Sequence, residues 1–237
     1  MGRKHMKRMT APRSWAVTRK TSYWVSKPSP GPHGKLESVP LLSVVRDMLK
    51  LCDNSREARF IIGSRMLNVD GKVVTDYKFP VGLMDVVTIK KTEQSYRMLM
   101  DYKGRFQLLP IEANETGWKL ARVDDKTVIR GGKVQLALHD GRSIVLPKDQ
   151  YKTGDVLKID LPSQKIQKSF KLDKGSVALL IGGSHPGTLQ TIESYQVKRG
   201  SAPNIVSFKE GFTTVKENVF VVGDKTPEIK LLEAKAV

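Results

Sequence analysis

The stretch Asn54–Lys72, NSREARFIIGSRMLNVDGK, combines the signals of a capped helix and a tight hairpin. Asn54 or Ser55 can accept the free amide hydrogens at the start of a helix, and Gly63 is a suitable residue to end it. The pair Asp70-Gly71 is typical of a type I′ turn between two short strands. We therefore predict a short helix followed directly by a β-hairpin.

The two faces of the predicted helix differ in chemistry. Ala58, Ile61 and Ile62 lie on one face at helical spacing, whereas Arg56 and Arg59 point together toward another. A lone pair of arginines is often merely solvated, and this alternative stays open from the helix alone. Two guanidinium groups on one exposed face also fit contacts with the phosphates of a nucleic acid.

The residues around this stretch extend it into a small module that spans residues 39–102. Apolar residues recur at helical spacing from Leu41 to Cys52 and predict a first amphipathic helix, with Cys52 as a small hydrophobic residue on its apolar face. Alternating apolar residues through Val86–Ile89 predict a closing strand. The module would then contain two helices, the hairpin and a further turn and strand.

The composition points to a partner with dense negative charge. The chain has 237 residues, with 41 Lys and Arg against 24 Asp and Glu, a formal charge of +17. Such a balance is typical of nucleic-acid-binding proteins, with an anionic membrane as the second possibility. No apolar run is long enough for a transmembrane helix, and no signal peptide is evident, so we expect a soluble, intracellular protein.

Residues 1–38 form the most basic part of the chain, with nine Lys and Arg and a single acid, Glu37. Trp15, Tyr23 and Trp24 are interleaved with these cations, which suits phosphate contacts combined with stacking on exposed bases. We expect this N-terminal extension to order only when it is bound. A disordered solubilising tail or a targeting peptide is the alternative.

The remaining chain predicts two β-rich sections. Residues 103–171 contain short apolar-polar alternations separated by glycine-containing turns, which favours a small barrel or sandwich. Residues 172–237 begin with a strand over Val177–Ile181, a glycine-rich loop that includes Gly187, and a second strand through Leu189 and Ile192. The loop lacks the spacing and the Lys-Ser/Thr pair of a phosphate-binding loop, so nucleotide binding is not expected.

Catalytic and metal-binding constellations are not evident in the sequence. The four histidines are scattered without ligand spacing, and one cysteine, Cys52, excludes an intrachain disulfide and a cysteine-rich zinc site. Asp124 and Asp125 are adjacent carboxylates, but neighbours on a strand point to opposite faces, so a turn or strand-edge role is expected. We predict no enzyme activity, no metal site and no cofactor.

Three features of the chain resemble known families. The SREAR helix and the V-D-G-K hairpin resemble the small RNA-binding module of several ribosomal proteins, pseudouridine synthases and tyrosyl-tRNA synthetases, although relatives usually have glycine where Arg65 stands. Residues 172–237 resemble the KOW motif, a β-hairpin module that binds RNA or proteins. The opening MGRKHMKRMTAPRSW, with Gly2, His5 and Trp15 at matching positions, resembles the start of the S4e family of archaeal and eukaryotic small-subunit ribosomal proteins.

The S4e resemblance implies a structural component of the small ribosomal subunit, present in one copy, in the cytoplasm. Its implied partners are small-subunit rRNA and neighbouring ribosomal proteins, with no membrane and no small-molecule substrate. The implied fold is α+β and multi-domain: an extended basic N-terminal arm (1–38), a small α/β RNA-binding module (39–102), a central β-rich domain (103–171) and a C-terminal KOW-like small β-barrel with the tail (172–237). A pseudouridine-synthase-type RNA-modifying enzyme and a free RNA-binding regulator are the alternatives.

The residues predicted to contact rRNA are basic, aromatic or small polar side chains in the arm, the helix-hairpin module and the KOW-like section. They are Arg3, Lys4, Lys7, Arg8, Arg13, Trp15, Arg19, Lys20, Trp24, Ser55, Arg56, Arg59, Arg65, Lys72, His185, Lys198 and Arg199.

Overall fold

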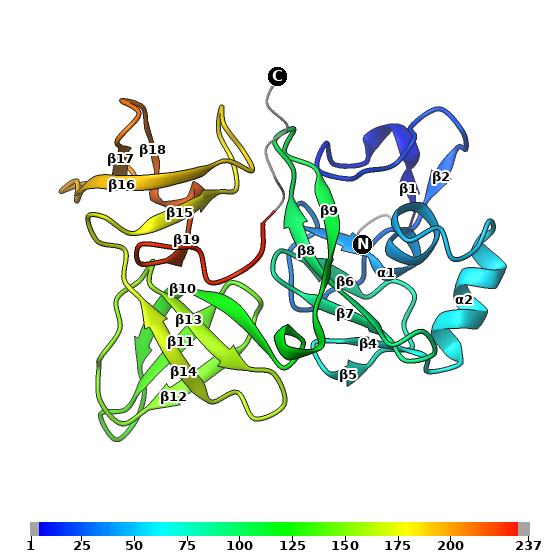
Figure 1. Cartoon of the computed structure of the whole chain (residues 1–237), viewed down its shortest axis with the longest axis horizontal. Helices are drawn as coiled ribbons and strands as arrows, with labels where there is room; N and C mark the ends of the chain where they lie inside the picture. The colour runs from blue at the N-terminus through cyan, green and yellow to red at the C-terminus, as the bar shows by residue number, and fades with distance from the viewer. Residues whose placement is uncertain (1–4, 232–237) are drawn as a thin grey trace. The chain divides into compact units, whose positions relative to one another are not determined.

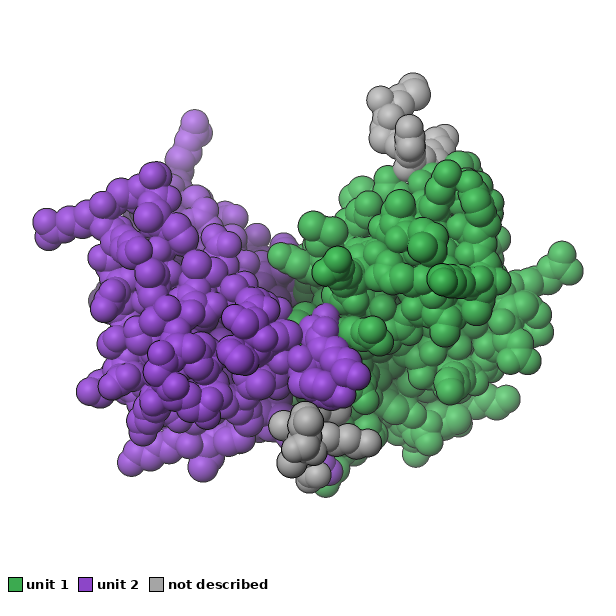
Figure 2. Space-filling model, turned by 90° about the horizontal axis from the view of Figure 1, so that it is seen from above, with its two compact units in different colours: residues 1–100, 105–117 green, residues 101–104, 118–237 purple. Residues whose placement is uncertain are grey.

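The computed structural model describes residues 5–231 and separates into two compact units. Unit 1 contains residues 1–100 and 105–117, and unit 2 contains residues 101–104 and 118–237 (Figure 2). The chain is mostly β structure, with few helices and several antiparallel sheets (Figure 1). This is consistent with the predicted multi-domain α+β class. The division into four sections remains a prediction.

Unit 1 contains both longer helical segments and three sheets. Its sheets have the strand orders β1-β2, β3-β6 and β5-β4-β7-β8-β9. In chain order the elements are β1 (Met6–Lys7), the 3₁₀ turn η1 (Arg8–Thr10), β2 (Trp24–Val25), β3 (Ser38–Pro40), α1 (Leu41–Ser43), the π-helical turn η2 (Val44–Met48), α2 (Ser55–Gly63), β4 (Leu67–Val69), β5 (Lys72–Val73), β6 (Pro80–Gly82), β7 (Val86–Ile89), β8 (Gln94–Met100), β9 (Phe106–Ile111) and η3 (Ala113–Glu115).

The first helix is shorter than the periodicity predicted. Helical structure runs through α1 and η2 and ends at Met48, not at Cys52. Lys50 adopts a left-handed conformation (φ 54°), which turns the chain out of the helix. Cys52 is consequently half-buried outside the helix, and its burial raises the pKa of the thiol.

The N-terminal segment, residues 5–36, packs on unit 1, whereas the sequence predicted that it orders only on binding. Trp15 explains the difference, because its side chain is 2% exposed and its indole N–H donates to the Ser38 carbonyl at 2.7 Å. The Phe106 amide also donates to the Ser14 carbonyl at 2.7 Å, which joins the segment to the start of β9. A buried aromatic side chain of this size supplies the apolar area that the basic composition alone did not suggest.

Unit 2 contains two five-stranded antiparallel sheets, with the orders β12-β11-β10-β13-β14 and β18-β17-β16-β15-β19. Its elements are β10 (Trp118–Val128), β11 (Val134–Leu138), β12 (Ser143–Leu146), β13 (Val156–Asp160), β14 (Ile166–Phe170), β15 (Val177–Leu180), β16 (Leu189–Gln196), β17 (Ile205–Phe208), β18 (Thr213–Val215), the 3₁₀ turn η4 (Lys216–Asn218) and β19 (Val219–Gly223).

The first sheet of unit 2 is bent at a bulge in its long central strand. The pairing of β10 with β11 shifts register between Val123 and Asp125, and Asp124 accepts a hydrogen bond from the Arg122 guanidinium at 2.7 Å. The adjacent carboxylates therefore occupy a β-bulge inside a strand. The strands β12 and β14 are the two edges, so the hydrogen bonding does not close this sheet into a barrel, which was one of the two predicted forms beside a sandwich.

A buried ion pair lies in the same sheet. The Lys119 ammonium lies 2.6 Å from Oδ2 of Asp140, and Nε of Arg142 lies 3.2 Å from the same oxygen. Burial acts to raise the pKa of Asp140, but the charges of Lys119, His139 and Arg142 outweigh it and hold that pKa below its ordinary value. Asp140 is thereby kept ionised beside two cations.

The second sheet of unit 2 contains the predicted strand pair. β15 and β16 are joined by the glycine-rich loop, whose Gly187 has φ 74°. A Cβ at Gly187 would lie 2.5 Å from the carbonyl carbon of Asp101, so the close approach of that backbone requires glycine.

Candidate nucleic-acid interface

Helix α2 begins where the sequence predicted. The side-chain oxygen of Asn54 accepts hydrogen bonds from the amides of Arg56 and Glu57, each at 2.9 Å. The Glu57 carboxylate in turn accepts from the Asn54 side-chain amide at 2.6 Å and from the Asp53 backbone amide at 3.2 Å. This reciprocal arrangement resembles a capping box and directs the one acid of the first turn toward the backbone.

The helix faces also match the predicted pattern. Ala58 and Ile62 are fully buried, and Ile61 is half-buried, whereas Arg56 and Arg59 are exposed. The guanidinium carbon of Arg59 lies 4.3 Å from the centre of the Tyr77 ring. Cation–π contact of this kind fixes the direction of a long side chain while it leaves the N–H groups able to bind an anion.

The hairpin that follows α2 has the predicted turn. Asp70 (φ 51°) and Gly71 (φ 75°) are both left-handed, as a type I′ turn requires. The buried Asp70 carboxylate accepts a hydrogen bond from the Val86 amide at 2.9 Å, so its negative charge is stabilised within the fold. Lys72, the first residue after the turn, is exposed.

Arg65 occupies the left-handed position at which the resemblance expected glycine. Its φ is 60°, while Gly63 is the last residue of α2. The strain of a left-handed non-glycine residue is modest, and the side chain remains exposed. A third cation is thus added between α2 and β4.

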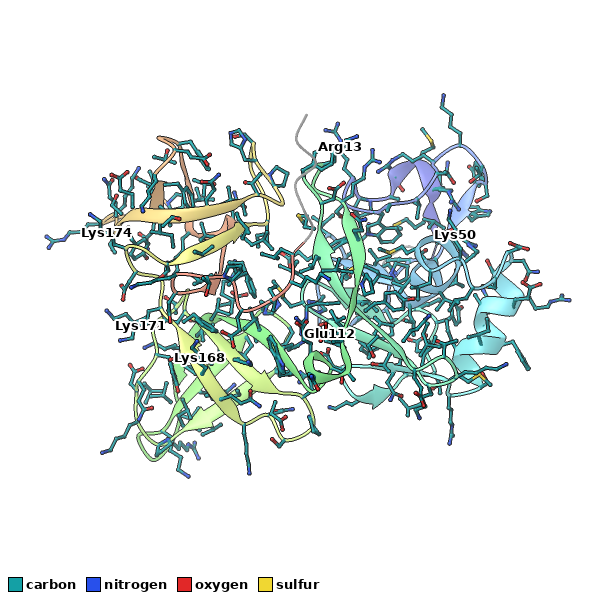
Figure 3. All side chains as sticks on the ribbon, viewed as in Figure 1. Arg13, Lys50, Glu112, Lys168, Lys171 and Lys174 are labelled. Carbon is teal, nitrogen blue, oxygen red and sulfur yellow. The ribbon has the colours of Figure 1, made fainter. Side chains whose placement is uncertain are left out.

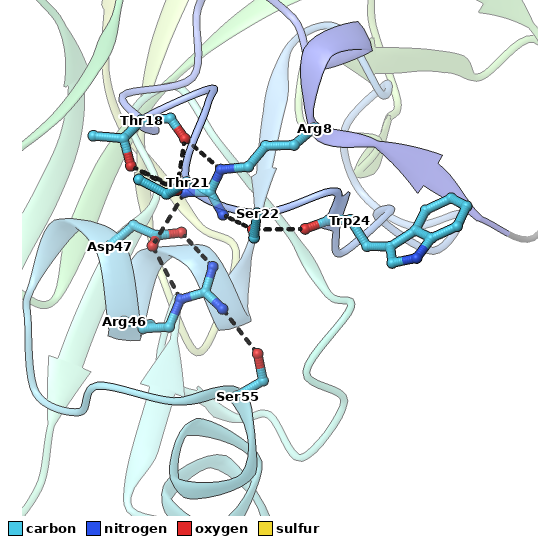
Figure 4. A network of polar contacts seen from close by, with 8 residues as sticks. All are labelled: Arg8, Thr18, Thr21, Ser22, Trp24, Arg46, Asp47 and Ser55. Atoms are coloured by element: carbon cyan, nitrogen blue, oxygen red, sulfur yellow. Dashed lines mark hydrogen bonds and ion pairs between the residues drawn. The ribbon is translucent and has the colours of Figure 1, made fainter.

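Ser55, which was predicted to contact rRNA, is engaged by a neighbouring side chain within the fold. It is half-buried, and its hydroxyl accepts a hydrogen bond from Arg46 at 2.8 Å. Arg46 also donates two hydrogen bonds to Asp47, at 3.0 and 2.9 Å (Figure 4). Arg46 fixes the start of α2 through its hydrogen bond to Ser55. The periodicity of the preceding helix gave no indication of this role.

Two residues of the arm predicted to contact rRNA lie inside unit 1. Trp15 is buried as described above, and the Arg8 side chain is also buried. Arg8 donates to the backbone carbonyl and the hydroxyl of Thr18 and to the Ser22 hydroxyl, and it lies 3.9 Å from Asp47 (Figure 4). In this conformation neither side chain offers a surface to RNA, because both are committed to the packing of the segment.

The other predicted arm residues are distributed differently. Arg19 is half-buried and donates to the backbone carbonyls of Met9, Ala11 and Pro12. Exposed side chains are Lys7, Arg13, Lys20 and Trp24, and Arg13 is labelled in Figure 3. Arg3 and Lys4 lie outside the described residues.

The predicted residues of unit 2 are exposed as well. His185 lies in the loop between β15 and β16, with its ring centre 4.9 Å from that of Phe212. Lys198 and Arg199 follow β16 in an exposed turn. Three further exposed lysines are Lys168, which lies in β14, and Lys171 and Lys174, which lie in the segment after β14 (Figure 3).

Two exposed aromatic side chains are absent from the predicted site. Phe60 was not singled out in the sequence, and Tyr23 was noted but not included among the contact residues. Phe60 on α2 is 76% exposed, and Tyr23 beside Trp24 is 61% exposed. Phe60 follows Arg59 directly, and the helical periodicity offered no apolar partner for it. That absence was a usable signal, since an aromatic residue off the apolar face of an amphipathic helix has to be exposed.

Other kinds of site find no support in the described part of the chain. Across residues 5–231 no three His, Cys, Asp or Glu side chains gather in a way that could hold a metal ion. In the same range no helix has the length and apolar content needed to cross a membrane.

Comparison with known proteins places these features in a family. The sequence models described as "Ribosomal family S4e" and "RS4NT (NUC023) domain" match residues 92–166 and 1–36. Small ribosomal subunit protein eS4 of Archaeoglobus fulgidus is 46% identical over 97% of both chains, and that of Methanothermobacter thermautotrophicus is 44% identical over 97% of this chain and 96% of the relative. The crystal structure of 30S ribosomal protein S4e from Thermoplasma acidophilum aligns with a TM-score of 0.71 and 38% identity, covering 79% of this chain and 96% of that one. Because near-full-length identity of this size accompanies the shared fold, the chain belongs to the S4e family of ribosomal proteins.

Proposed function

We propose that this chain is a structural, non-catalytic component of the small ribosomal subunit that binds rRNA and supports subunit assembly and translation. The observation that carries the proposal is the 46% identity to a small ribosomal subunit protein eS4 over 97% of both chains. The curated relatives are named as small ribosomal subunit proteins, so an RNA-modifying enzyme is not favoured.

Within unit 1, the rRNA surface is formed by α2 and the hairpin. Arg56, Arg59, Arg65 and Lys72 are exposed, while the acids Glu57 and Asp70 are directed into caps and backbone hydrogen bonds. The surface therefore presents four exposed cations, while the carboxylates of Glu57 and Asp70 accept hydrogen bonds from within the fold. Such a surface binds phosphates through counterion release and gives little base-specific recognition.

The arm and unit 2 contribute further contacts. Lys7, Arg13, Lys20 and Trp24 extend the surface along the N-terminal segment, and Arg3 and Lys4 continue the basic run in the sequence. In unit 2 the strands β15 and β16 and their loop form a KOW-like element, with His185 in the loop and Lys198 and Arg199 after β16 as contact residues. Neighbouring ribosomal proteins are the other partners, and one copy is present in each cytoplasmic small subunit.

Sedimentation tests the ribosomal role directly. Cell lysate is separated on a sucrose gradient at moderate and then at high salt, and the chain is followed by quantitative mass spectrometry. We expect stoichiometric co-sedimentation with the small subunit at moderate salt and partial release at high salt, since phosphate contacts weaken with salt. Recovery mainly in the light fractions would contradict the proposal and favour a free RNA-binding regulator.

Binding to rRNA is tested separately with purified protein. The protein is titrated with protein-free small-subunit rRNA at several salt concentrations, and the Arg56→Gln/Arg59→Gln double variant is compared with wild type. We expect the double variant to bind more weakly and to lower the slope of log K against log salt by about 1.4–1.8, two phosphate contacts at 0.7–0.9 each. An unchanged slope would exclude α2 from the interface.

A further inference from the structure

The two-stranded ribbon β1-β2 has one buried face and one open face. Met6 pairs with Val25, and both are buried, whereas Lys7 pairs with Trp24, and both are exposed. Paired residues of a ribbon point to the same side, and successive residues point to opposite sides. Lys7 and Trp24 therefore share the face that points away from the core of unit 1.

Aromatic rings and cations gather on this open face. Tyr23 is 61% exposed and Trp24 is 55% exposed, and their ring centres lie 4.6 Å apart with the planes 84° apart. The His5 ring lies 5.7 Å from the Trp24 ring, and the Lys7 ammonium lies 5.3 Å from the Tyr23 ring. More than half of each large ring remains exposed even with these neighbours.

Buried Arg8 holds the backbone of this cluster in place. Its amide donates to the Tyr23 carbonyl at 2.9 Å, and its guanidinium donates to the Ser22 hydroxyl at 3.0 Å. The Ser22 hydroxyl in turn lies 3.3 Å from the Trp24 carbonyl, while the indole ring of Trp24 points away from this network (Figure 4). The backbone that carries the exposed rings is thus held in place by hydrogen bonds to buried Arg8.

We propose that Tyr23 and Trp24 form a platform for an unpaired base of the rRNA, in which the base stacks on the Trp24 ring, the perpendicular Tyr23 ring borders its edge, and Lys7 contacts the adjacent phosphate. This inference rests on the proposed function, because it names how part of that rRNA is held. The surrounding charge favours RNA over a protein partner, since residues 1–38 contain nine Lys and Arg and one acid. Exposed aromatic rings flanked by cations bind unpaired bases by stacking on their π-faces.

Alanine and conservative variants test the platform. Full-length Tyr23→Ala, Trp24→Ala and Trp24→Phe are titrated with protein-free small-subunit rRNA and with a fully paired RNA duplex. We expect Trp24→Ala to bind the rRNA about 5- to 150-fold more weakly, the usual range for loss of a stacking ring, Tyr23→Ala to bind it more weakly by a smaller factor, and Trp24→Phe to retain most of the affinity. Binding to the duplex, which has no free base to stack, should not change.

Salt dependence separates stacking from charge. The alanine variants should keep the wild-type slope of log K against log salt, whereas Lys7→Gln should lower it by about 0.7. Tyr102→Ala is the matched control, because Tyr102 is also exposed and lies 5.1 Å from the Lys103 ammonium but belongs to no aromatic cluster. Circular dichroism and thermal unfolding confirm that each variant is folded.

Several outcomes would overturn the platform. They are unchanged rRNA affinity in both alanine variants, equal loss on rRNA and duplex, or loss of binding to another ribosomal protein with rRNA affinity intact, which would assign the cluster to a protein partner. If wild-type protein itself fails to bind the rRNA, the proposed function fails first. Wild-type binding with unaffected variants removes the stacking inference alone.

Discussion

The N-terminal segment and the β10–β14 sheet each bury a basic side chain, but the distance from that side chain to a carboxylate differs between them. Arg8 is surrounded mainly by neutral oxygens from Thr18 and Ser22, with the Asp47 carboxylate 3.9 Å away. Lys119 instead lies 2.6 Å from Asp140. The sheet neutralises its buried cation at 2.6 Å, whereas Arg8 is paired at 3.9 Å with a carboxylate that it shares with Arg46, so the segment keeps a net positive charge.

Cations that are only half-buried in the sheet repeat the same contrast. In the β10–β14 sheet, Lys126 pairs with Asp149 at 2.8 Å, and Arg122 pairs with Asp124 at 2.7 Å. No acid occurs between His5 and Leu36 that could pair locally with the cations of the N-terminal segment. The half-buried cations of the sheet are thus paired within the fold, whereas exposed cations of the segment such as Arg13 and Lys20 have no acid within their own segment.

The largest effect is expected from breaking the buried pair of the sheet. Lys119→Met leaves the Asp140 carboxylate with Arg142 as its remaining close cation, and we expect the free energy of unfolding to fall by about 3–5 kcal/mol. Urea unfolding followed by circular dichroism measures this loss. Lys126→Met, in the more exposed pair with Asp149, is the control and should lose about 0–1 kcal/mol. Equal losses in the two variants would remove the distinction between the pairs.

A smaller loss is expected from Trp15 in the segment. Trp15→Phe removes the indole N–H and leaves the Ser38 carbonyl without that donor, so the free energy of unfolding should fall by about 1–3 kcal/mol. Affinity for rRNA should be unchanged while the variant is folded. The comparison variant Trp24→Phe, at an exposed ring, should change stability by less than about 0.5 kcal/mol. Weaker rRNA binding by Trp15→Phe without loss of stability would instead place Trp15 at the interface.

The start of α2 should be sensitive to its cap. Asn54→Ala removes the acceptor for the amides of Arg56 and Glu57, and we expect a loss of about 1 kcal/mol. Hydrogen exchange at these two amides should speed up in the same variant. Asn54→Asp keeps an acceptor oxygen and should retain most of the protection, so similar exchange in both variants would argue against the cap.

The smallest stability effect is expected at the hairpin. Lys72→Gln should change the free energy of unfolding by less than about 0.5 kcal/mol, because the side chain is exposed. It should nevertheless lower the slope of log K for rRNA against log salt by about 0.7–0.9. Lys126→Gln is the matched control, since its ammonium already pairs with Asp149, and its slope should equal that of wild type. Equal slopes in all three proteins would contradict a phosphate contact at Lys72.

Local signals in the sequence were sufficient where neighbours in the chain decide the structure. The Asn54 cap, the Asp70-Gly71 turn and the strands β15 and β16 depend on residues a few positions apart, and each was predicted. Burial of Arg8 and Trp15 depends on partners such as Thr18 and Ser38, 10 and 23 positions away. Composition and periodicity carry no information on such pairings, so the basic segment was predicted to be unfolded on its own.

The candidate interface shows the same limit. The exposure of Arg56 and Arg59 follows from the period of their own helix and was predicted. The contacts of Ser55 with Arg46 and of Arg59 with Tyr77 join separate elements and could not be derived from spacing. Sequence reasoning thus identified the charged face but not the side chains that orient it.

The hydrogen bond between the Phe106 amide and the Ser14 carbonyl bears on the order of events during synthesis. A growing chain emerges with its N-terminus first, and elongation at about 5–20 residues per second separates residue 36 from Phe106 by roughly 4–14 seconds. During that interval the basic segment has been made while its β9 partner has yet to be made. The first part of unit 1 to appear is therefore among the last to acquire all its contacts, and its cations meet the crowded surface of the translating ribosome before they are locked into the fold.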